Sequence, residues 1–508
     1  MRTDVLIVGA GPTGLVLALW LTKIGIGVRI IDKTAEPGTT SRALVVQART
    51  LELYRQLDLT DAVIARAFRA NAVNMWVRGE RRARVPIGAI GEGLTPYPYL
   101  EIFPQDDHER LLIERLAALG VSVQRQRELV GFVDDGTGIT ARIRTPDGME
   151  EICECRYIVG CDGARSTVRQ GIGADFPGGT YRQVFYVADI QGSGPCVNKE
   201  LNVALDDADF ILVFPMSGDG RVRLVGVVSD ERAERAETLT FDDVSRTAID
   251  ALKLQVEKVH WFSTYRVHHR VADRFYKGRA FLAGDAGHIH SPAGGQGMNT
   301  GIGDAINLAW KLAMVVRDEA DPNLLASYEA ERIGFARRLV HTTDRGFTFA
   351  TADGRIADLV RTRVVPFILP IATRISAVTE FMFRTVSQTM LNYREGPLSE
   401  GKAGDVHGGD RLPWAAVQGV DNYDSLSAIT WQVHVYGTAK DSVVNWCAAH
   451  GIPLHVFHWA KAYDEAGLAR DAVYLIRPDT YVALAEPSGN AEALERYFST
   501  RRIRLRKA

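Results

Sequence analysis

Apolar and polar positions alternate in blocks along the first part of the chain. Residues 5–8 (VLIV) form a continuous apolar run that predicts a buried parallel strand. Residues 15–24 follow with the length and apolar content of a helix, and residues 28–31 form another apolar run that predicts a second strand. This strand–helix–strand order indicates an α/β fold with a parallel sheet near the N-terminus.

The middle of the chain has a different pattern. Its apolar segments are short, rich in β-branched residues and separated by Asp, Gly and Ser, which predicts an antiparallel sheet inserted into the first domain. The expected strands are residues 185–190, 201–205, 210–214 and 222–228. Farther along, residues 332–393 predict a helical region, and the glycine-rich, charged residues 395–409 predict a linker before a last domain.

Composition narrows the class of protein. The chain has 508 residues, of which 46% are hydrophobic and 24% charged, enough for two or three packed domains. A formal net charge of −2 and a pI near 6.7 give no reason to expect nucleic acid or an anionic membrane as a partner. The apolar run at residues 364–372 is shorter than the roughly 20 residues that span a bilayer. We therefore expect no membrane contact.

The N-terminus and the cysteines give two further expectations. Asp4 interrupts the start of the chain and the next apolar run ends in Gly9, a pattern that predicts a cytoplasmic protein without a signal peptide. The five cysteines form no C-x-x-C pair and lack the histidine spacing of zinc sites. We expect free thiols and no structural metal.

A glycine-rich turn follows the first predicted strand. Gly9, Gly11 and Gly14 have the spacing of the Rossmann dinucleotide-binding fingerprint, with Pro12 and Thr13 between them. In that motif the first glycine permits the tight turn, the second lets the backbone approach a pyrophosphate, and the third lets the helix pack closely on the strand. The N-terminus of the helix then faces the anion.

An acidic residue ends the second predicted strand. Asp32 stands where a carboxylate accepts hydrogen bonds from ribose hydroxyls, and Lys33 follows it in the same candidate site. The strand, the glycines, the helix and the acid together predict a dinucleotide site. They do not distinguish FAD from NAD.

A second glycine-rich stretch covers residues 279–305. It predicts a strand over residues 280–283, a Gly284–Asp285 turn, a loop over residues 288–299 and a helix from about Gly301. This stretch resembles the Gly-Asp motif of the class A flavoprotein monooxygenases, the family of para-hydroxybenzoate hydroxylase and phenol hydroxylase. In that family the aspartate hydrogen-bonds the ribityl chain of FAD and the loop wraps the flavin ring.

The resemblance assigns Gly284 and Asp285 to FAD, and it places Pro292 beside the reacting edge of the flavin as a candidate catalytic residue. The loop residues that it assigns to the flavin are Pro292, Gly294, Gly295, Gln296, Gly297, Met298 and Asn299. Glycines let backbone N–H groups reach a planar ring, and the following helix directs its positive end toward the edge where reduced flavin carries negative charge. Such a preorganised dipole favours reduction of the flavin.

Smaller signals extend the resemblance. Asp162, Arg165 and Arg169 lie in a segment that resembles the family's Asp-Gly motif, which contributes to the FAD pyrophosphate region and to NAD(P)H contact. Asp-Gly is also a common turn. Arg42 matches a family arginine near the FAD phosphates or the flavin, and Gln105 matches a flavin-contacting glutamine. Surface positions are the alternative for Arg42 and Gln105.

The resemblance implies a monooxygenase with FAD as cofactor, NADPH or NADH as reductant and O2 as co-substrate. In the family an electron-rich ring attacks a flavin C4a-hydroperoxide, so water must be excluded from the site. The implied substrate is a small phenolic or polycyclic aromatic molecule, and a homodimer is a candidate assembly. His288 and His290 flank the loop and are either proton relays or structural histidines.

Other functions stay open. An antibiotic- or polyketide-modifying monooxygenase, including Baeyer–Villiger-type or inactivating oxidation, fits the same motifs. A flavin-dependent halogenase shares the nucleotide fingerprint, but no two tryptophans here are two positions apart, as the W-x-W-x-I-P halogenase signature requires. A flavoprotein that only binds its cofactor is the third alternative.

The expected fold class is therefore α/β, with a Rossmann-like FAD-binding domain, an inserted antiparallel-sheet substrate domain and a C-terminal thioredoxin-like α/β domain. Residues 409–414 and 473–483 resemble the tail of phenol-hydroxylase-type enzymes, without a C-x-x-C pair. The expected boundaries are residues 1–75, 100–180 and 270–345 for the FAD-binding domain, 76–99 and 181–269 for the substrate domain, 346–395 for a helical connector and 400–508 for the last domain. Candidate pocket aromatics, or ordinary core residues, are Tyr97, Tyr99, Tyr186, Phe210 and Phe214.

Overall fold

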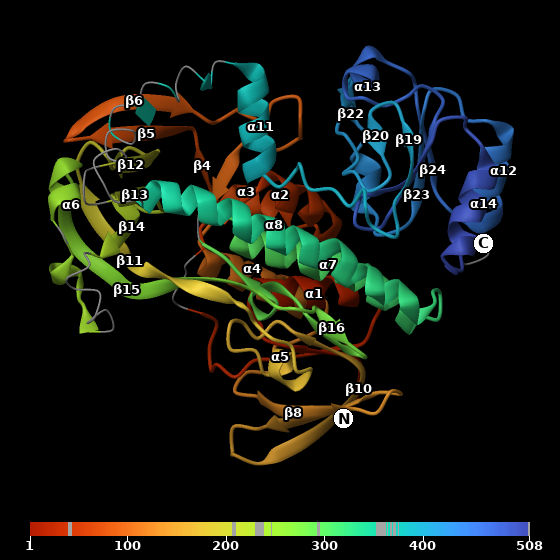
Figure 1. Ribbon diagram of the computed structural model, residues 1–508, viewed down its shortest axis with the longest axis horizontal. Helices are drawn as coiled ribbons and strands as arrows, with labels where there is room; N and C mark the ends of the chain where they lie inside the picture. The colour runs from red at the N-terminus through yellow and green to blue at the C-terminus, as the bar shows by residue number, and fades with distance from the viewer. Residues whose placement is uncertain are drawn as a thin grey trace.

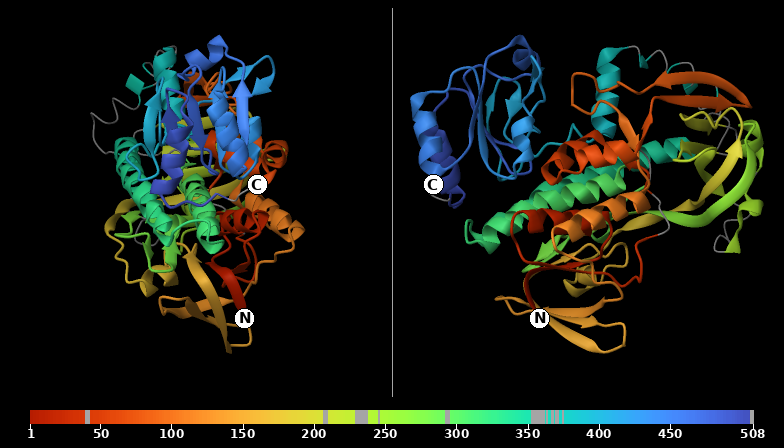
Figure 2. Two further views of the ribbon diagram at one scale, coloured as in Figure 1. Left: turned by 90° about the vertical axis from the view of Figure 1, so that its right-hand side faces the viewer. Right: turned by 180° about the vertical axis from the view of Figure 1, so that it is seen from behind.

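A computed structural model describes residues 1–38, 43–205, 210–228, 238–244, 246–291, 295–351, 362, 364–365, 368, 372–373 and 375–505. A C-terminal unit lies at one end of the molecule and a large sheet with long strands lies at the other (Figure 1). Between them run two long helices, α7 (Gly297–Val316) and α8 (Ala326–Thr351). The view from behind has the same order (Figure 2).

A seven-stranded sheet forms the first core. Along its path β16-β17-β10-β1-β2, strand β1 is parallel to β2 and β10, and β10 is parallel to β17. The strands are β1 (Arg2–Val8), β2 (Val28–Ile31), β8 (Glu128–Asp134), β9 (Ile139–Arg144), β10 (Glu150–Gly160), β16 (Tyr276–Lys277) and β17 (Ala280–Leu282). The α/β fold class predicted from the hydrophobic pattern is confirmed.

Helices pack against this sheet, and α1 begins directly after the first glycine-rich turn. Helix α1 (Pro12–Lys23) packs against α7, and the indole rings of Trp20 and Trp310 are buried in the same core. α1 begins earlier than the expected residues 15–24, because proline is favoured in the first turn of a helix. Further helices are α2 (Ala48–Tyr54), α3 (Thr60–Arg66), α4 (Gln105–Ala118) and α5 (Thr167–Gly171).

An eight-stranded sheet in the order β18-β15-β11-β14-β13-β12-β5-β6 extends from this core. Its strands are β5 (Ala72–Val77), β6 (Glu80–Pro86), β11 (Gly178–Ser193), β12 (Leu201–Leu205), β13 (Phe210–Pro215), β14 (Arg221–Val228), β15 (Gln255–Val271) and β18 (His288–Ile289). All four expected strands are present, and every pair is antiparallel except β5 with β12. A small three-stranded sheet packs against this large sheet. Its strands are β3 (Val45–Val46), β7 (Leu100–Ile102) and β4 (Phe68–Ala70).

Of two expectations about the later part of the chain, the helical region is confirmed in part and the linker is wrong. The helical region over 332–393 is represented by α8 and by α11 (Ser376–Val386), and residues 387–393 are not helical. The expected linker over 395–409 contains β19 (Glu400–Ala403) and β20 (Val406–His407). Its composition suggested a loop, but β19 pairs in parallel with β26 of the next unit, which satisfies its backbone groups.

The C-terminal unit is a six-stranded sheet in the order β20-β19-β26-β25-β23-β24. β23 (Gln432–Tyr436) is parallel to β24 (Leu454–Phe457) and antiparallel to β25 (Val473–Ile476), which continues antiparallel into β26 (Val482–Glu486). With α12 (Asp441–His450), α13 (Lys461–Glu465) and α14 (Ala491–Thr500), this order is the thioredoxin-like arrangement. All five cysteines are free. Among the described residues, no helix has the length and apolar character needed to cross a membrane.

Candidate functional site

The glycine fingerprint forms a tight turn between β1 and α1. Gly9 has a φ of +103°, and a Cβ on it would lie 2.3 Å from the carbonyl oxygen of Cys161. A Cβ on Gly14 would lie 2.0 Å from the carbonyl oxygen of Gly9. A Cβ on Gly11, by contrast, would meet nothing within 4 Å. The turn therefore leaves open space at the N-terminus of α1, where backbone N–H groups and the helix dipole favour an anion.

Asp32 joins the end of β2 to this turn. Its Oδ2 accepts a hydrogen bond from the Ala10 N–H at 2.7 Å, and its Oδ1 accepts from the N–H and hydroxyl of Thr34 at 2.8 and 2.7 Å. An ionised carboxylate offers about four lone-pair sites, so this half-buried group keeps acceptor capacity for a ligand. The side chain of Lys33 is exposed nearby in the chain.

The Gly-Asp turn of the second stretch touches the first stretch directly. Gly284 has a φ of +62°, and a Cβ on it would lie 2.7 Å from Oγ1 of Thr13. A Cβ on Gly301 of α7 would lie 2.3 Å from the same atom. Thr13 is thus enclosed between two glycines, and the two glycine-rich stretches form one continuous site. Asp285 is exposed at this turn.

Asn299 fixes the loop before α7 to the small sheet and to α2. Its Oδ1 accepts from the Gln47 N–H at 2.9 Å and from the Thr50 hydroxyl at 2.7 Å. Its Nδ2 donates to the carbonyl oxygens of Val45 at 2.9 Å and Gly295 at 2.8 Å. Both polar atoms of the Asn299 side chain are therefore hydrogen-bonded within the protein, and these bonds hold the loop in place.

Gln296 is also bound by the protein. Its Nε2 donates to the carbonyl oxygen of Val386 at 2.7 Å, and its Oε1 accepts from Nε2 of Gln388 at 2.6 Å. The first turn of α7 then begins at Gly297 and continues with the partly exposed Met298. This end of α7 presents backbone N–H groups and the positive end of a 20-residue helix dipole.

Three residues that the resemblance assigned to the cofactor, Pro292, Gly294 and Arg42, lie outside the described residues. Gln105 begins α4, and its amide donates to Oε1 of Glu109 at 2.8 Å. Burial raises the pKa of Glu109, which also accepts a hydrogen bond from the chain at residue 38. Gln105 and Glu109 therefore lie beside Gly38.

Asp162 lies between the fingerprint turn and α5. Its Oδ2 accepts from the N–H groups of Thr167 at 2.7 Å and Val168 at 3.3 Å. Its Oδ1 is buried and has no hydrogen-bond partner within the described ranges. Burial raises the pKa of Asp162, opposed by the hydrogen bonds it accepts.

The two arginines of this segment differ in environment. Arg165 is exposed, whereas Arg169 is buried and donates to the carbonyl oxygen of Ala286 at 2.9 Å. The guanidinium of Arg169 also lies over the ring of Phe176 at 4.0 Å. Arg169 thus ties α5 to the Gly-Asp turn, and Arg165 is left facing solvent.

The two histidines of the loop also differ. His288 is 1% exposed, and its Nε2 pairs with Oδ2 of Asp304 at 2.6 Å. Nδ1 of His290 bonds to the carbonyl oxygen of Ser291 at 2.9 Å, and its Nε2 has no partner among the described residues. Burial, reinforced by the neighbouring His288, lowers the pKa of His290 to about 4, so His290 is neutral at pH 7.

These groups fit a flavin dinucleotide. The open space at Gly11 suits a pyrophosphate, and Asp32 suits a ribose. Among the described residues, the loop and the Asp-Gly segment also leave buried polar atoms without partners at Asp162, His290 and Ser291. Buried polar groups in folded proteins are normally hydrogen-bonded, so these atoms are suited to a bound ligand.

Comparison with known proteins settles the family. The family described as "FAD binding domain" matches residues 2–343, which is more than half of the chain. The chain belongs to this family. It is a flavoprotein monooxygenase with FAD, a reduced nicotinamide and O2 as its cofactor and co-substrates.

Relatives of this chain are aromatic and polyketide monooxygenases. A 6-methylpretetramide 4-monooxygenase of Streptomyces rimosus is 35% identical over 430 residues, covering 84% of this chain and 76% of that protein. A pentachlorophenol 4-monooxygenase of Sphingobium chlorophenolicum is 28% identical over 97% of this chain and 87% of its own. The solved structure of OxyS anhydrotetracycline hydroxylase from Streptomyces rimosus is similar with a TM-score of 0.77 and 29% identity, over 98% of this chain and 99% of that one.

In this monooxygenase the eight-stranded sheet has two different faces. Alternate residues such as Tyr186 and Leu224 are buried in the core cluster that also contains residues of α6 (Thr247–Ala251). The opposite face holds the buried Arg223, which pairs with Asp189. Seven residues of this face on β5, β12, β13 and β14 are apolar and partly exposed. They are Val73, Leu201, Val203, Leu212, Phe214, Val225 and Val227. Part of this face packs with Val45 and Ile102 of the small sheet, next to the flavin loop.

The expected pocket aromatics separate on these two faces. Phe214 belongs to the partly exposed face. Tyr186 is 1% exposed and stacks on Phe262, so its assignment to the pocket is wrong. Successive side chains of a strand point to opposite faces of the sheet, so Tyr186 points into the core and away from the partly exposed face. The side chain of Phe210 lies outside the described part, and Tyr97 and Tyr99 contact each other with ring centroids 6.5 Å apart.

Sequence reasoning missed the residues that support the loop from the helix side. Asp304 of α7 accepts a hydrogen bond from the Gly284 N–H at 3.0 Å and one from Nε of Arg332 at 2.6 Å. Burial would raise the pKa of Asp304, but Arg332 and His288 outweigh it and lower that pKa to about 2. A signal was present: Thr300, Asp304, Asn307 and Lys311 recur at helical spacing in an otherwise apolar helix.

Proposed function

We propose that the protein hydroxylates a phenolic substrate with several fused rings. The observation that carries this proposal is the set of seven apolar, partly exposed residues across β5, β12, β13 and β14, beside the loop that precedes α7. Neighbouring strands lie about 4.8 Å apart, so four strands present a surface ~14 Å wide. A surface of that width suits a fused-ring system better than a single ring.

Two relatives support a fused-ring substrate by their names, which refer to 6-methylpretetramide and anhydrotetracycline. A single-ring phenol is the second candidate, because the pentachlorophenol 4-monooxygenase matches 97% of this chain. A modification that inactivates or rearranges a polyketide uses the same cofactor site. The products therefore have to decide between these reactions.

Bound FAD, once reduced by the nicotinamide, supplies the activation of O2. We assign the pyrophosphate to Gly11 and the N-terminus of α1, the ribose to Asp32, and the ribityl chain to Asp285. Backbone groups at the start of α7, from Gly297, are assigned to the flavin ring. The helix dipole there favours the negative charge that reduced flavin carries.

His290 is the residue that we assign to proton movement near the loop. It is neutral at pH 7, and its Nε2 is without a partner among the described residues, so that atom is able to accept or pass a proton. His288 is not assigned this part, because its Nε2 is bonded to Asp304. We assign contact with the nicotinamide nucleotide to the exposed Arg165.

The test is a screen of fused-ring and single-ring phenols against the purified, FAD-reconstituted protein. NADPH and NADH oxidation is followed, hydrogen peroxide is assayed, and the product mass is measured. The proposal expects a fused-ring phenol to stimulate oxidation and to gain one oxygen atom. Stimulation that yields only hydrogen peroxide identifies an effector and contradicts the assignment of that compound as substrate.

Three further points belong to this proposal. We propose a cytoplasmic location, a homodimer, and domain limits at residues 1–75, 100–180 and 270–345, 76–99 and 181–269, 346–395 and 400–508. Light scattering of the purified protein tests the dimer. The limits at 75/76, 180/181 and 269/270 fall inside β5, β11 and β15. Limited proteolysis with mass mapping therefore tests the limit between residues 395 and 400, where cleavage would spare the sheets.

A further inference from the structure

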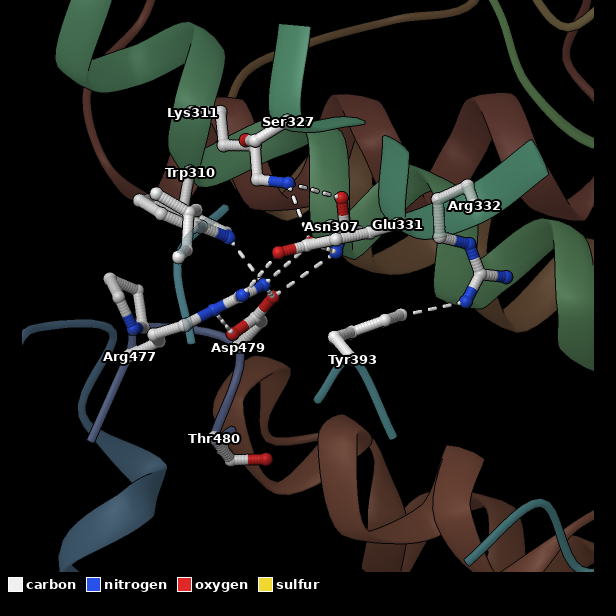
Figure 3. A network of polar contacts seen from close by, with 12 residues as sticks. Asn307, Trp310, Lys311, Ser327, Glu331, Arg332, Tyr393, Arg477, Asp479 and Thr480 are labelled. Carbon is white, nitrogen blue, oxygen red and sulfur yellow. Dashed lines mark hydrogen bonds and ion pairs between the residues drawn. The ribbon is translucent and has the colours of Figure 1, made fainter. Parts of the chain in front are cut away.

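The C-terminal unit inserts a charged turn into the flavin-binding part. This turn, Arg477–Thr480, joins β25 to β26 and is almost completely buried. Arg477 donates to both carboxylate oxygens of Glu331 on α8, at 2.6 and 3.0 Å. Asp479 accepts from Nε1 of Trp310 on α7 at 3.0 Å (Figure 3).

Charges at this contact are balanced. Glu331 also accepts from Nζ of Lys311 at 2.8 Å, and Arg477 also bonds to Asp479 at 2.9 and 2.5 Å. Two carboxylates therefore face two cations, all with side chains at most 2% exposed. Removing one member would leave a buried charge uncompensated, which is far more costly than never having built the pair.

The same two helices carry the support of the flavin turn. Arg332 follows Glu331 on α8 and donates to Asp304 at 2.6 Å and to the Thr300 carbonyl at 3.0 Å. Asp304 in turn holds the Gly284 N–H and His288. Adjacent residues of α8 thus reach the C-terminal turn on one side and the flavin turn on the other.

The polar stripe of α7 has the same two ends. Thr300 and Asp304 lie toward the flavin turn, and Asn307 and Lys311 lie toward the C-terminal turn. All four are at most 2% exposed. Asn307 donates to Glu331 at 2.7 Å and accepts from Lys311 at 2.8 Å. The stripe therefore connects the two turns through buried, hydrogen-bonded side chains.

A small cavity lies between the two ends. Its volume is about 20 Å³, enough for a single water molecule, and its lining includes Arg49, Asn299, Arg332 and Asp479. Arg49 donates to the Asp479 carbonyl at 3.1 Å and to the Thr480 hydroxyl at 2.8 Å, whereas its Nε has no partner among the described residues. Asn299 is the residue that fixes the flavin loop, so the C-terminal turn and that loop share one cavity.

We propose that the Arg477–Thr480 turn is a positioning element of the flavin site, acting through Glu331 and Arg332 of α8 and the polar stripe of α7. The C-terminal unit does not touch the reacting atoms in this account. It sets where the N-terminus of α7 and the Gly284 turn lie, and so it sets how tightly FAD is held and how easily FAD is reduced. The proposal rests on FAD occupying this site.

The test compares Asp479→Asn with Arg55→Ala as a matched control. Arg55 also joins the two units, pairing with Asp421 at 2.9 Å and Asp424 at 2.6 Å, and neither of these ion pairs involves α7 or α8. We expect Asp479→Asn to raise the Kd for FAD about tenfold or more, the scale on which supporting residues act, and to shift the flavin midpoint potential. Arg55→Ala should leave the Kd and the potential unchanged.

A second, milder variant keeps the proposal testable if Asp479→Asn does not fold. Tyr393→Phe removes the hydroxyl that accepts from Arg332 at 2.9 Å and keeps the buried ring. It should shift the midpoint potential in the same direction as Asp479→Asn, with a smaller change in Kd. Wild-type Kd and potential in folded Asp479→Asn and Tyr393→Phe, with only the melting temperature lowered, would overturn the proposal. A wild-type protein that binds no FAD would instead contradict the proposed function itself.

Discussion

The two glycine-rich stretches, which we assign to one cofactor site, are held in different ways. In the first, strand, turn and helix are consecutive, and the closest contact is between Gly14 and the backbone of Gly9. In the second, the Gly284 turn is held by Thr13, Asp304 and, through Asp304, by Arg332. The first stretch depends on local backbone packing, whereas the second depends on buried side chains brought from elsewhere in the chain. Substitutions should therefore damage the two stretches in different ways.

The largest effect is expected from Gly14→Ala. Its Cβ would lie 2.0 Å from a backbone oxygen, so β1 and α1 must separate. We expect a loss of about 3 kcal/mol in the free energy of unfolding, the upper end for overpacking, and loss of FAD binding. Chemical denaturation and FAD titration measure both.

Gly11→Ala is the matched control for that substitution. Gly11 has an extended conformation that any residue adopts, and its Cβ would meet nothing within 4 Å. We expect stability within about 0.5 kcal/mol of wild type, as for an open position, together with weaker FAD binding. Wild-type FAD affinity in Gly11→Ala would contradict the placement of the pyrophosphate.

Asp304→Asn should follow Gly14→Ala in its effect on FAD binding, although its cost to stability is at least as large. It leaves Arg332 buried without its carboxylate, and breaking such a pair costs about 3–5 kcal/mol. Thermal unfolding of the apoprotein measures this loss. Asp304→Asn should also weaken FAD binding, although Asp304 need not touch FAD. In this respect the second stretch differs from the first. Equal stability of Asp304→Asn and wild type would show that the remote support is dispensable.

Acid should act mainly on the second stretch and its helices. Burial would raise the pKa of Glu331, but Arg477 and Lys311 lower it from 4.5 to about 2. A carboxyl whose folded pKa lies below its unfolded value adds stability above pH 4.5 and loses it as pH falls toward 2. Melting temperatures between pH 5 and pH 3 should therefore fall less steeply in Glu331→Gln than in wild type. Parallel slopes for the two proteins would count against the charged network.

The smallest effect separates the two arginines of the Asp-Gly segment. Arg165→Ala should raise the KM for the nicotinamide nucleotide several-fold and leave FAD binding unchanged, because Arg165 is exposed. Arg169→Ala should instead weaken FAD binding, because Arg169 donates to Ala286 beside the Gly-Asp turn. Steady-state kinetics and FAD titration distinguish them. A reversed pattern would exchange the two assignments.

Sequence reasoning succeeded where the pattern is local. The apolar runs at β1 and β2 predicted the parallel core, and the fingerprint predicted the turn with its acid at Asp32. The strands β12, β13 and β14 follow from short β-branched segments. These features depend on neighbours in the chain, so they are visible without any tertiary structure.

Sequence reasoning failed where remote contacts decide. β19 forms within an expected linker because β26 offers a pairing edge. Tyr186 lies on the face of the sheet that is buried in the core, because strand phase is set by β14 and β15. Asp304 meets Arg332 of α8, and Glu331 meets Arg477 of the C-terminal turn. No periodicity in α7 or α8 identifies which distant charge will meet them.

The central claim is that one FAD site, built from both glycine-rich stretches, transfers an oxygen atom from O2 to an aromatic substrate. The most direct measurement incubates the reconstituted protein with reduced nicotinamide, a fused-ring phenol and isotopically heavy O2, followed by mass spectrometry of the product. The account predicts one heavy oxygen atom in the product ring system. A product whose added oxygen comes from water, or an unchanged phenol beside hydrogen peroxide for every compound that stimulates oxidation, would contradict it.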